Sequence, residues 1–213
     1  HYKFTIQPNM VFEIESNWKT EEDYIGALSK KYRDQYKRAQ KKFDGIVVKN
    51  LSLEEIIQHE NTIYDLYHYV AINAPFNTFF LSKNHFSTMK NQCANRFLLF
   101  GYFLNDKLVG FHTLLLNGPV LETYFLGYDH NIQKENMLYL NMLYNMTHFG
   151  IENGFDKIIF GRTALEIKSS IGAVPVQMSG FMYHTNTFIN KYLGKLFKKI
   201  EPQVTWQMRH PFK

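Results

Sequence analysis

Three apolar segments joined by two short turns constrain the fold of this chain most. The segments are Phe97–Leu104, 107–116 and Val120–Tyr128. An Asn-Asp pair at 105–106 and an Asn-Gly-Pro stretch at 117–119 separate them. Short polar turns between apolar runs are typical of β-hairpins. The sequence therefore predicts an antiparallel meander of three strands.

The segments around the meander predict a mixed sheet flanked by helices. We expect strands at 46–48, 157–160, 174–183 and 204–208, and helices at 52–70, 82–93, 134–153, 163–170 and 186–199. A long helix between two strands favours a parallel crossover. Strand 157–160 should therefore pair in parallel with Val120–Tyr128, and the two strands should then splay apart.

Residues 1–44 differ in character from the rest. Alternating apolar residues at 2–15 predict one or two strands interrupted by Pro8. A capping box at Thr20 predicts one continuous helix over 20–42, strongly basic in its second half. The chain starts without Met. We interpret residues 1–44 as a strand and basic helical arm, a remnant of or linker to a preceding domain, and 45–213 as the main domain. The residues before the helix should then look like the edge of a missing partner.

Composition excludes several classes of protein. The chain has 213 residues, 45% of them hydrophobic, which suffices for a full core. Its one cysteine, Cys93, excludes a disulfide framework and favours a reducing compartment, the cytoplasm. No apolar stretch approaches the roughly 18 residues of a membrane span. The nine histidines form no metal-binding motif and no G-x-S-x-G elbow is present, so we predict neither a metal nor hydrolysis by a serine nucleophile.

The net charge of +5 favours anionic partners: nucleic acid, an anionic lipid surface or a phosphorylated cofactor. The basic residues gather in Lys30–Lys42, where tyrosines interleave at helical spacing. This segment could bind tRNA. The alternative is a helix packed on the domain with a solvated basic back.

A family resemblance rests on residues 124–172. The stretch reads YFLGYD at 124–129, GIENGFDK at 150–157 and IIFGRT at 158–163, followed by Lys168 and Gly172. It resembles the FemAB-like and CelD-like branch of the GNAT superfamily of acyltransferases, where a Gly-Arg pair ends a strand and a Lys and then a Gly follow. The resemblance implies a bacterial enzyme with an α/β fold: a mixed α+β sheet of the GNAT-like acyl-CoA N-acyltransferase type, preceded by a basic helical arm.

The sequence departs from the family pattern at two places. Ile167 replaces an aromatic residue, and residues 169–171 (Ser-Ser-Ile) replace basic and aromatic ones. The pyrophosphate loop Gln/Arg-x-x-Gly-x-Gly/Ala is absent, and residues 129–136 in its place contain no glycine. A helix N-terminus can still bind phosphate through its N–H groups.

The resemblance places the catalytic base on the strand that ends at Asp129. Acyl transfer to an amine needs a positioned acceptor, a proton acceptor and oxyanion stabilisation. Glu122, Tyr124 and Asp129 are the candidates for this role. In the alternative interpretation Glu122 is a solvated strand residue and Tyr124 belongs to the core.

A second set of residues is expected to hold the donor in the opening between the two diverging strands. These are Tyr128, Asn131, Lys134, Asn136, Arg162 and Lys168. The two cations near residue 165 suit a phosphate or carboxylate. Their alternative role is an ion pair with Glu166 or Asp156.

Three functions follow as hypotheses. The first is an N-acyltransferase that moves an acyl group from acyl-CoA, such as acetyl-CoA, to a small-molecule or peptide amine. The second is a FemAB-like aminoacyltransferase that uses aminoacyl-tRNA in cell-wall peptide synthesis. The third is a non-catalytic binding module on a GNAT scaffold, which the glycine-free residues 129–136 favour over the first.

Overall fold

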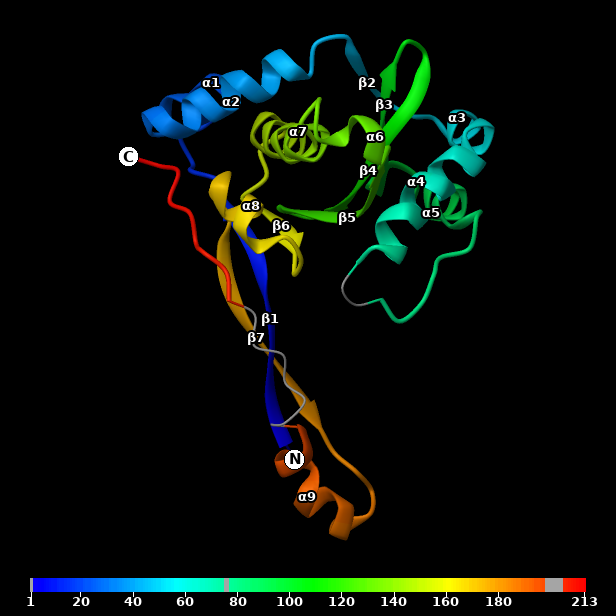
Figure 1. Cartoon of the computed structure of the whole chain (residues 1–213), viewed down its shortest axis with the longest axis vertical. Coiled ribbons are helices and arrows are strands. Elements are labelled where there is room, and N and C mark those ends of the chain that lie inside the picture. The colour runs from blue at the N-terminus through cyan, green and yellow to red at the C-terminus, as the bar shows by residue number, and fades with distance from the viewer. Residues whose placement is uncertain (1, 75–76, 198–204) are drawn as a thin grey trace.

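One mixed sheet organises the molecule (Figure 1). The computed structural model describes residues 2–74, 77–197 and 205–213. The strands of the sheet run in the order β2-β3-β4-β5-β6-β1-β7. Their bounds are β1 Tyr2–Glu13, β2 Ile46–Asn50, β3 Phe97–Leu104, β4 Lys107–Asn117, β5 Val120–Tyr128, β6 Lys157–Gly161 and β7 Val174–Met182.

The predicted meander and crossover are both confirmed. β3, β4 and β5 pair antiparallel in succession. Asn105 and Asp106 both have positive φ, as a two-residue hairpin turn requires. β5 and β6 pair in parallel through Val120↔Lys157, Leu121↔Ile158 and Glu122↔Ile159. The crossover between them runs through the long helix α7.

Helices cover both faces of the sheet. α1, α2 and α7 lie on one face, and α3, α4 and α5 on the other (Figure 1). The bounds are α1 Glu21–Ala27, α2 Lys30–Lys42, α3 Leu53–Gln58, α4 Glu60–Ile72, α5 His85–Cys93, α6 His130–Gln133, α7 Leu138–Glu152, α8 Leu165–Ser170 and α9 Thr187–Phe197, with a 3-10 turn at Ala94–Arg96. Each face has its own hydrophobic core.

The prediction of one helix over 20–42 is wrong, because the chain breaks at Leu28 and Ser29. Leu28 is extended and forms a β-bridge with Phe212, and the Ser29 N–H donates to the Pro211 carbonyl. The C-terminal tail thus takes the backbone groups that a continuous helix would use. The helix expected at 52–70 is also divided in two, at His59, and the helix expected at 134–153 begins later, at Leu138, after a turn over 134–137.

β1 is an interior strand of the sheet. Its residues Met10 to Glu13 pair with β6, and its residues from Tyr2 to Val11 pair with β7. The expectation that these residues resemble the edge of a missing partner is therefore wrong. α2 packs its tyrosines and Ala39 into the core of the same body, and its lysines stay exposed, as the packed-helix interpretation expects. The origin of residues 1–44 as a remnant or linker stays a prediction.

The C-terminal residues do not form the predicted last strand. Residue 204 lies outside the described residues, and 205–211 have no strand structure. Instead the tail carries Phe212 to an aromatic cluster, where its ring lies 5.6 Å from Trp18 and 6.2 Å from Tyr24. The tail therefore stabilises the fold by packing. The helix expected at 186–199 is α9, and the end of that range lies outside the described residues.

β1 and β7 continue together beyond β6 as a two-stranded ribbon. Residues 2–6 of β1 pair only with β7 among the described strands. Figure 1 shows this ribbon extending away from the helices, with α9 at its far end. Among the described residues, no helix combines the length and apolar character needed to cross a bilayer.

Candidate functional site

The candidate site lies where β5 and β6 part. Their parallel pairing ends at Glu122↔Ile159. Two residues further on, Gly161 of β6 pairs with Met10 of β1 on the other side. Beyond Glu122, β5 has no strand partner on its β6 side among the described residues. This divergence is the one that the crossover prediction anticipated.

A β-bulge in β5 lies at the same place. His112 pairs with Leu126 and Leu114 with Thr123, so two β5 residues, Tyr124 and Phe125, oppose Thr113 alone. The Thr113 hydroxyl accepts a hydrogen bond from the Phe125 N–H at 2.9 Å and donates to the Phe125 carbonyl at 2.7 Å. A bulge bends its strand and redirects side chains. Here it brings the Tyr124 and Phe125 rings to 4.5 Å.

His85, the first residue of α5, completes this cluster. Its Nε2 lies 3.2 Å from the Tyr124 hydroxyl oxygen, and its ring lies 5.8 Å from the Tyr124 ring and 6.3 Å from that of Phe125. Burial lowers the pKa of His85 and raises the pKa of Tyr124. The pair therefore holds a neutral imidazole beside a protonated phenol at neutral pH.

Helix α4 packs closely against this part of β5. A side chain at Gly127 would meet the backbone of Leu66 and Tyr67 at 2.5 Å, so only glycine allows this close approach. The Tyr67 ring contacts Phe125 at 5.5 Å, edge to face. Helix α4 therefore packs directly against the strand and the aromatic residues of its bulge.

The bulge reverses the alternation of side chains along β5. Glu122 lies before it, half-buried, and accepts a hydrogen bond from Asn117 Nδ2 at 2.7 Å. After it, Tyr128 packs on the opposite face of the sheet, in the core that α1, α2 and α7 cover. Its ring lies 6.2 Å from the Tyr139 ring of α7. Burial raises the pKa of Tyr128. Tyr128 thus lies away from the His85 side.

Asp129 caps a helix in the structure. Its carboxylate accepts hydrogen bonds from the N–H and the side-chain amide of Asn131, both at 2.9 Å, and lies 3.9 Å from Lys107 Nζ. An aspartate in this position stabilises the start of α6. The structure therefore commits Asp129 and Asn131 to local contacts with each other.

The segment before α7 is tied to the end of α2. Asn136 Nδ2 donates to the Lys42 carbonyl at 3.0 Å, and Lys42 Nζ donates to the Glu135 carbonyl at 3.1 Å. The buried Asn141 side chain donates to the Ala39 carbonyl at 3.1 Å. Lys134 is exposed. The helix start expected to face phosphates is thus in contact with protein groups.

The two cations near α8 have different environments. Arg162 is exposed. Lys168 is only 4% exposed, and its Nζ donates to the Phe160 carbonyl at 2.5 Å. Burial lowers the pKa of Lys168 to about 8. Glu166, the expected ion-pair partner, instead binds Arg209.

The sequence did not indicate His85 as a site residue. It lies 39 residues from Tyr124 in a segment without a motif. Only the packing of α5 against β5 brings the two together. A histidine near the start of a predicted helix was the one signal available in the sequence.

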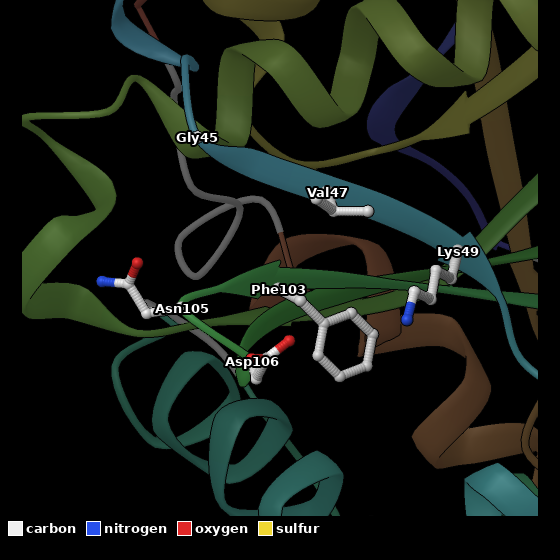
Figure 2. Close-up of a pocket in the computed structure, with 6 residues that line it drawn as sticks. All are labelled: Gly45, Val47, Lys49, Phe103, Asn105 and Asp106. Carbon is white, nitrogen blue, oxygen red and sulfur yellow. The ribbon is translucent and has the colours of Figure 1, made fainter.

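Two shallow hollows are lined by residues other than His85, Tyr124 and Phe125. Figure 2 shows one of about 250 Å³ at the β2 edge, lined by Gly45, Val47, Lys49, Phe103, Asn105 and Asp106. A second, of about 340 Å³, lies between α3 and α5. Neither contains a predicted site residue. Among the residues that the structure describes, no three His, Cys, Asp or Glu side chains are grouped to hold a metal ion.

No family model and no curated protein sequence matches this chain. Among solved structures, FemX superposes with a TM-score of 0.57 at 14% identity, covering 74% of this chain and 54% of that chain. A conserved protein of unknown function from Bacteroides thetaiotaomicron superposes with a TM-score of 0.58 at 12% identity, covering 84% and 60%. The chain has a GNAT/FemAB-like fold.

A third structure agrees with this fold. The C-terminal domain of a putative lysylphosphatidylglycerol synthetase from Agrobacterium fabrum superposes with a TM-score of 0.54 at 9% identity, covering 84% of this chain and 60% of that one. The chain thus spans 54% to 60% of the length of these three proteins. At such low identities the likeness establishes the GNAT/FemAB-like fold alone.

Proposed function

We propose that this chain transfers an aminoacyl or acyl group from an activated ester or thioester to an amine, at the point where β5 leaves β6. The observation that carries the proposal is the His85–Tyr124 pair, which stands on the bulge two residues beyond the last β5–β6 pair. Such a transfer needs a proton acceptor next to the acyl carbon, and this pair supplies one.

The pair supports a two-step proton path. A neutral His85 with its proton on Nδ1 accepts the Tyr124 hydroxyl hydrogen bond at Nε2. As the amine nitrogen forms its bond to the acyl carbon, it loses a proton to the Tyr124 oxygen, and the Tyr124 proton passes to His85. The bond from the acyl carbon to the leaving oxygen or sulfur then breaks, and the leaving group takes up the proton from His85. After the transfer Tyr124 is protonated again and His85 is neutral again, so the pair gains and loses no net proton.

The donor is proposed to lie along the open side of β5. Backbone groups there have no strand partner beyond Glu122 among the described residues. An extended donor could pair with them as an added strand would. Arg162, exposed at the end of β6, is proposed to bind a donor phosphate, whereas the buried Lys168 is proposed to hold the end of β6 in position.

The contacts before α7 favour an aminoacyl ester over acyl-CoA. A pyrophosphate there would need free backbone N–H groups, but the Asn131 N–H donates to the Asp129 carboxylate and the Asn136 N–H donates to the Ile132 carbonyl. The resemblance to FemAB-like proteins, which take aminoacyl groups from tRNA, supports the same choice. The exposed lysines of α2 are proposed to contact the tRNA backbone. Acyl-CoA is the second candidate donor, and Lys134 is its nearest proposed phosphate contact.

The test compares both donors on one protein. Binding of acetyl-CoA is measured by calorimetry, and single-turnover loss of the aminoacyl group from charged tRNA is measured with Nα-acetyl-lysine as the probe amine. We expect transfer from tRNA, a weaker donor complex in Arg162→Ala, and unchanged donor binding in the control Arg96→Ala. Binding of acetyl-CoA alone would favour acyl-CoA. If neither donor binds, the proposed transfer from these donors is wrong and the hypothesis of a non-catalytic module is favoured.

A further inference from the structure

The end of the β1–β7 ribbon carries an unusual concentration of exposed apolar side chains. We name residues 2–7 and 177–197 the distal arm. Of the fourteen exposed large hydrophobic residues in the described chain, six lie in this arm: Met178, Phe181, Tyr183, Phe188, Ile189 and Tyr192. Phe188 is 72% exposed and Phe181 is 71% exposed. A soluble surface rarely gathers so much apolar area without a binding role.

Helix α9 presents its apolar side away from the ribbon. A side chain added at Gly194 would meet the Tyr2 ring at 3.0 Å, so the Gly194 side of the helix packs on β1. Phe188, Ile189 and Tyr192 lie on the opposite side at the helical repeat, and all three are exposed. The Phe188 and Tyr192 rings contact each other at 5.3 Å. The helix is therefore amphipathic with its apolar side outward.

The distal arm is also basic. From Ile167 to Ile200 the sequence contains no Asp or Glu, and α9 itself contains Lys191 and Lys195. Lys191 is exposed beside the apolar side of the helix. On β1, exposed Lys3 lies 5.9 Å over the Phe181 ring. Apolar and positive groups thus share one end of the molecule.

The position of the arm suits a flat surface. Figure 1, drawn with the longest axis vertical, shows α9 at one extreme of the molecule, far from α1 to α5. A plane could reach this tip without contacting the body. The catalytic pair at β5 lies on the body, so the arm is separate from the proposed reaction site.

We propose that the distal arm docks the protein on an anionic lipid bilayer, with Phe188, Ile189 and Tyr192 in the interface and Lys191 at the headgroups. A basic amphipathic helix with aromatic residues on its apolar side is the usual form of an interfacial anchor. Aromatic rings favour the boundary between headgroups and acyl chains. This docking goes beyond the proposed transfer reaction and does not depend on it.

Two other occupants fit the arm less well. A second copy of the arm would bring lysines against lysines, which repel. A nucleic acid would stack on aromatic rings but would leave the apolar Ile189 and Met178 side chains exposed to water. A bilayer with anionic headgroups satisfies both the apolar and the positive groups.

The experiment measures co-sedimentation of the whole chain with vesicles. One set is phosphatidylcholine alone, and the other is an equimolar mixture of phosphatidylcholine and phosphatidylglycerol. We expect binding to the anionic vesicles only, weakened by added salt because the charge attraction is screened. The double variant Phe188→Ser/Ile189→Ser should lower the partition coefficient at least about tenfold. Lys191→Gln should lower it about fivefold.

Matched controls lie in the loop between α4 and α5. Phe79 is 61% exposed, and Lys83 is exposed. Phe79→Ser and Lys83→Gln remove the same chemical groups far from the arm, and should bind as the parent does. In a separate variant, Phe188→Trp should show blue-shifted tryptophan emission on adding anionic vesicles. Circular dichroism checks that each variant is folded.

Four results would overturn the proposal. They are no vesicle binding, equal binding to both vesicle types, equal loss in arm and loop variants, and a dimer in light scattering that Phe188→Ser/Ile189→Ser dissolves without lipid. If the arm variants lose tRNA binding and retain vesicle binding, the arm is instead a nucleic-acid surface. The transfer assay is independent of these results, because its donor and acceptor are soluble.

Discussion

The Nζ of Lys168 lies 2.5 Å from the carbonyl oxygen of Phe160, inside the protein. Phe160 follows Ile159, the last β6 residue paired with β5. Lys168 therefore satisfies a carbonyl group at the point where the two strands part. Lys168 is thus a titratable group in a buried position. The free-energy cost of burying it depends on whether its amine is protonated, and therefore on pH.

Stability should rise with pH through the titration of Lys168. The folded state holds its pKa at about 8, against 10.5 for an unperturbed lysine. Between these values the unfolded state binds more protons, so the free energy of unfolding increases as the pH rises. The full increase is about 3 kcal/mol. Buried tyrosines with raised pKa values, such as Tyr24 and Tyr144, oppose this rise near pH 10 in any variant. Urea unfolding across this range should therefore show the parent gaining stability relative to Lys168→Met, and parallel curves would contradict it.

The acid limb of the transfer rate should report His85. Burial lowers the pKa of His85 below 6.5, and only the neutral imidazole can accept a proton. The single-turnover rate should therefore rise with pH through a pKa below 6.5 and then level off. His85→Gln should remove this limb and lower the rate about 100-fold or more. His59→Gln, in the break between α3 and α4, is the control, and an unchanged profile in His85→Gln would exclude His85 as the base.

Replacing Asn141 should destabilise the contact between α2 and α7. The side chain is fully buried, donates to the Ala39 carbonyl and accepts from Gln40 Nε2. Asn141→Leu leaves these groups buried without partners, at a cost of about 2–3 kcal/mol. Urea denaturation measures the loss. Asn61→Ala, exposed on α4, should change the stability by less than about 0.5 kcal/mol.

Two glycines should respond oppositely to alanine. At Gly127 the new Cβ would lie 2.5 Å from the α4 backbone, which must move, so Gly127→Ala should cost about 1–3 kcal/mol. At Gly26, in α1, nothing lies within 4 Å, and alanine should stabilise by about 0.5–1 kcal/mol. Thermal unfolding compares the two variants. A neutral Gly127→Ala would show that α4 is not fixed on β5.

The local interactions along the chain could be predicted well. Turn residues at 105–106 and 117–119 with alternating apolar segments were sufficient for the meander, and helix length for the parallel β5–β6 pairing. Helix continuity was predicted poorly. The break at Leu28 depends on its β-bridge with Phe212, which lies 184 positions further along the chain in the C-terminal tail.

The candidate site was predicted only in part. Tyr124 was identified by its place on the strand, but its partner His85 comes from helix α5, which precedes the meander in the chain. Asp129 and Asn136 were identified by position, and the structure uses both in local contacts. Polar residues at helix starts serve as caps as readily as ligands, and sequence alone does not separate the two uses.

The sequence by itself determined the sheet centre, because strand alternation and turn chemistry act between neighbours along the chain. The tertiary structure decided the interior place of β1, the burial of Lys168 and the meeting of His85 with Tyr124. Each of these depends on contacts between residues far apart in sequence. Their favourable free energy comes from burial in a shared core, which offsets the entropy lost in closing long loops, and no local pattern records which segments will meet.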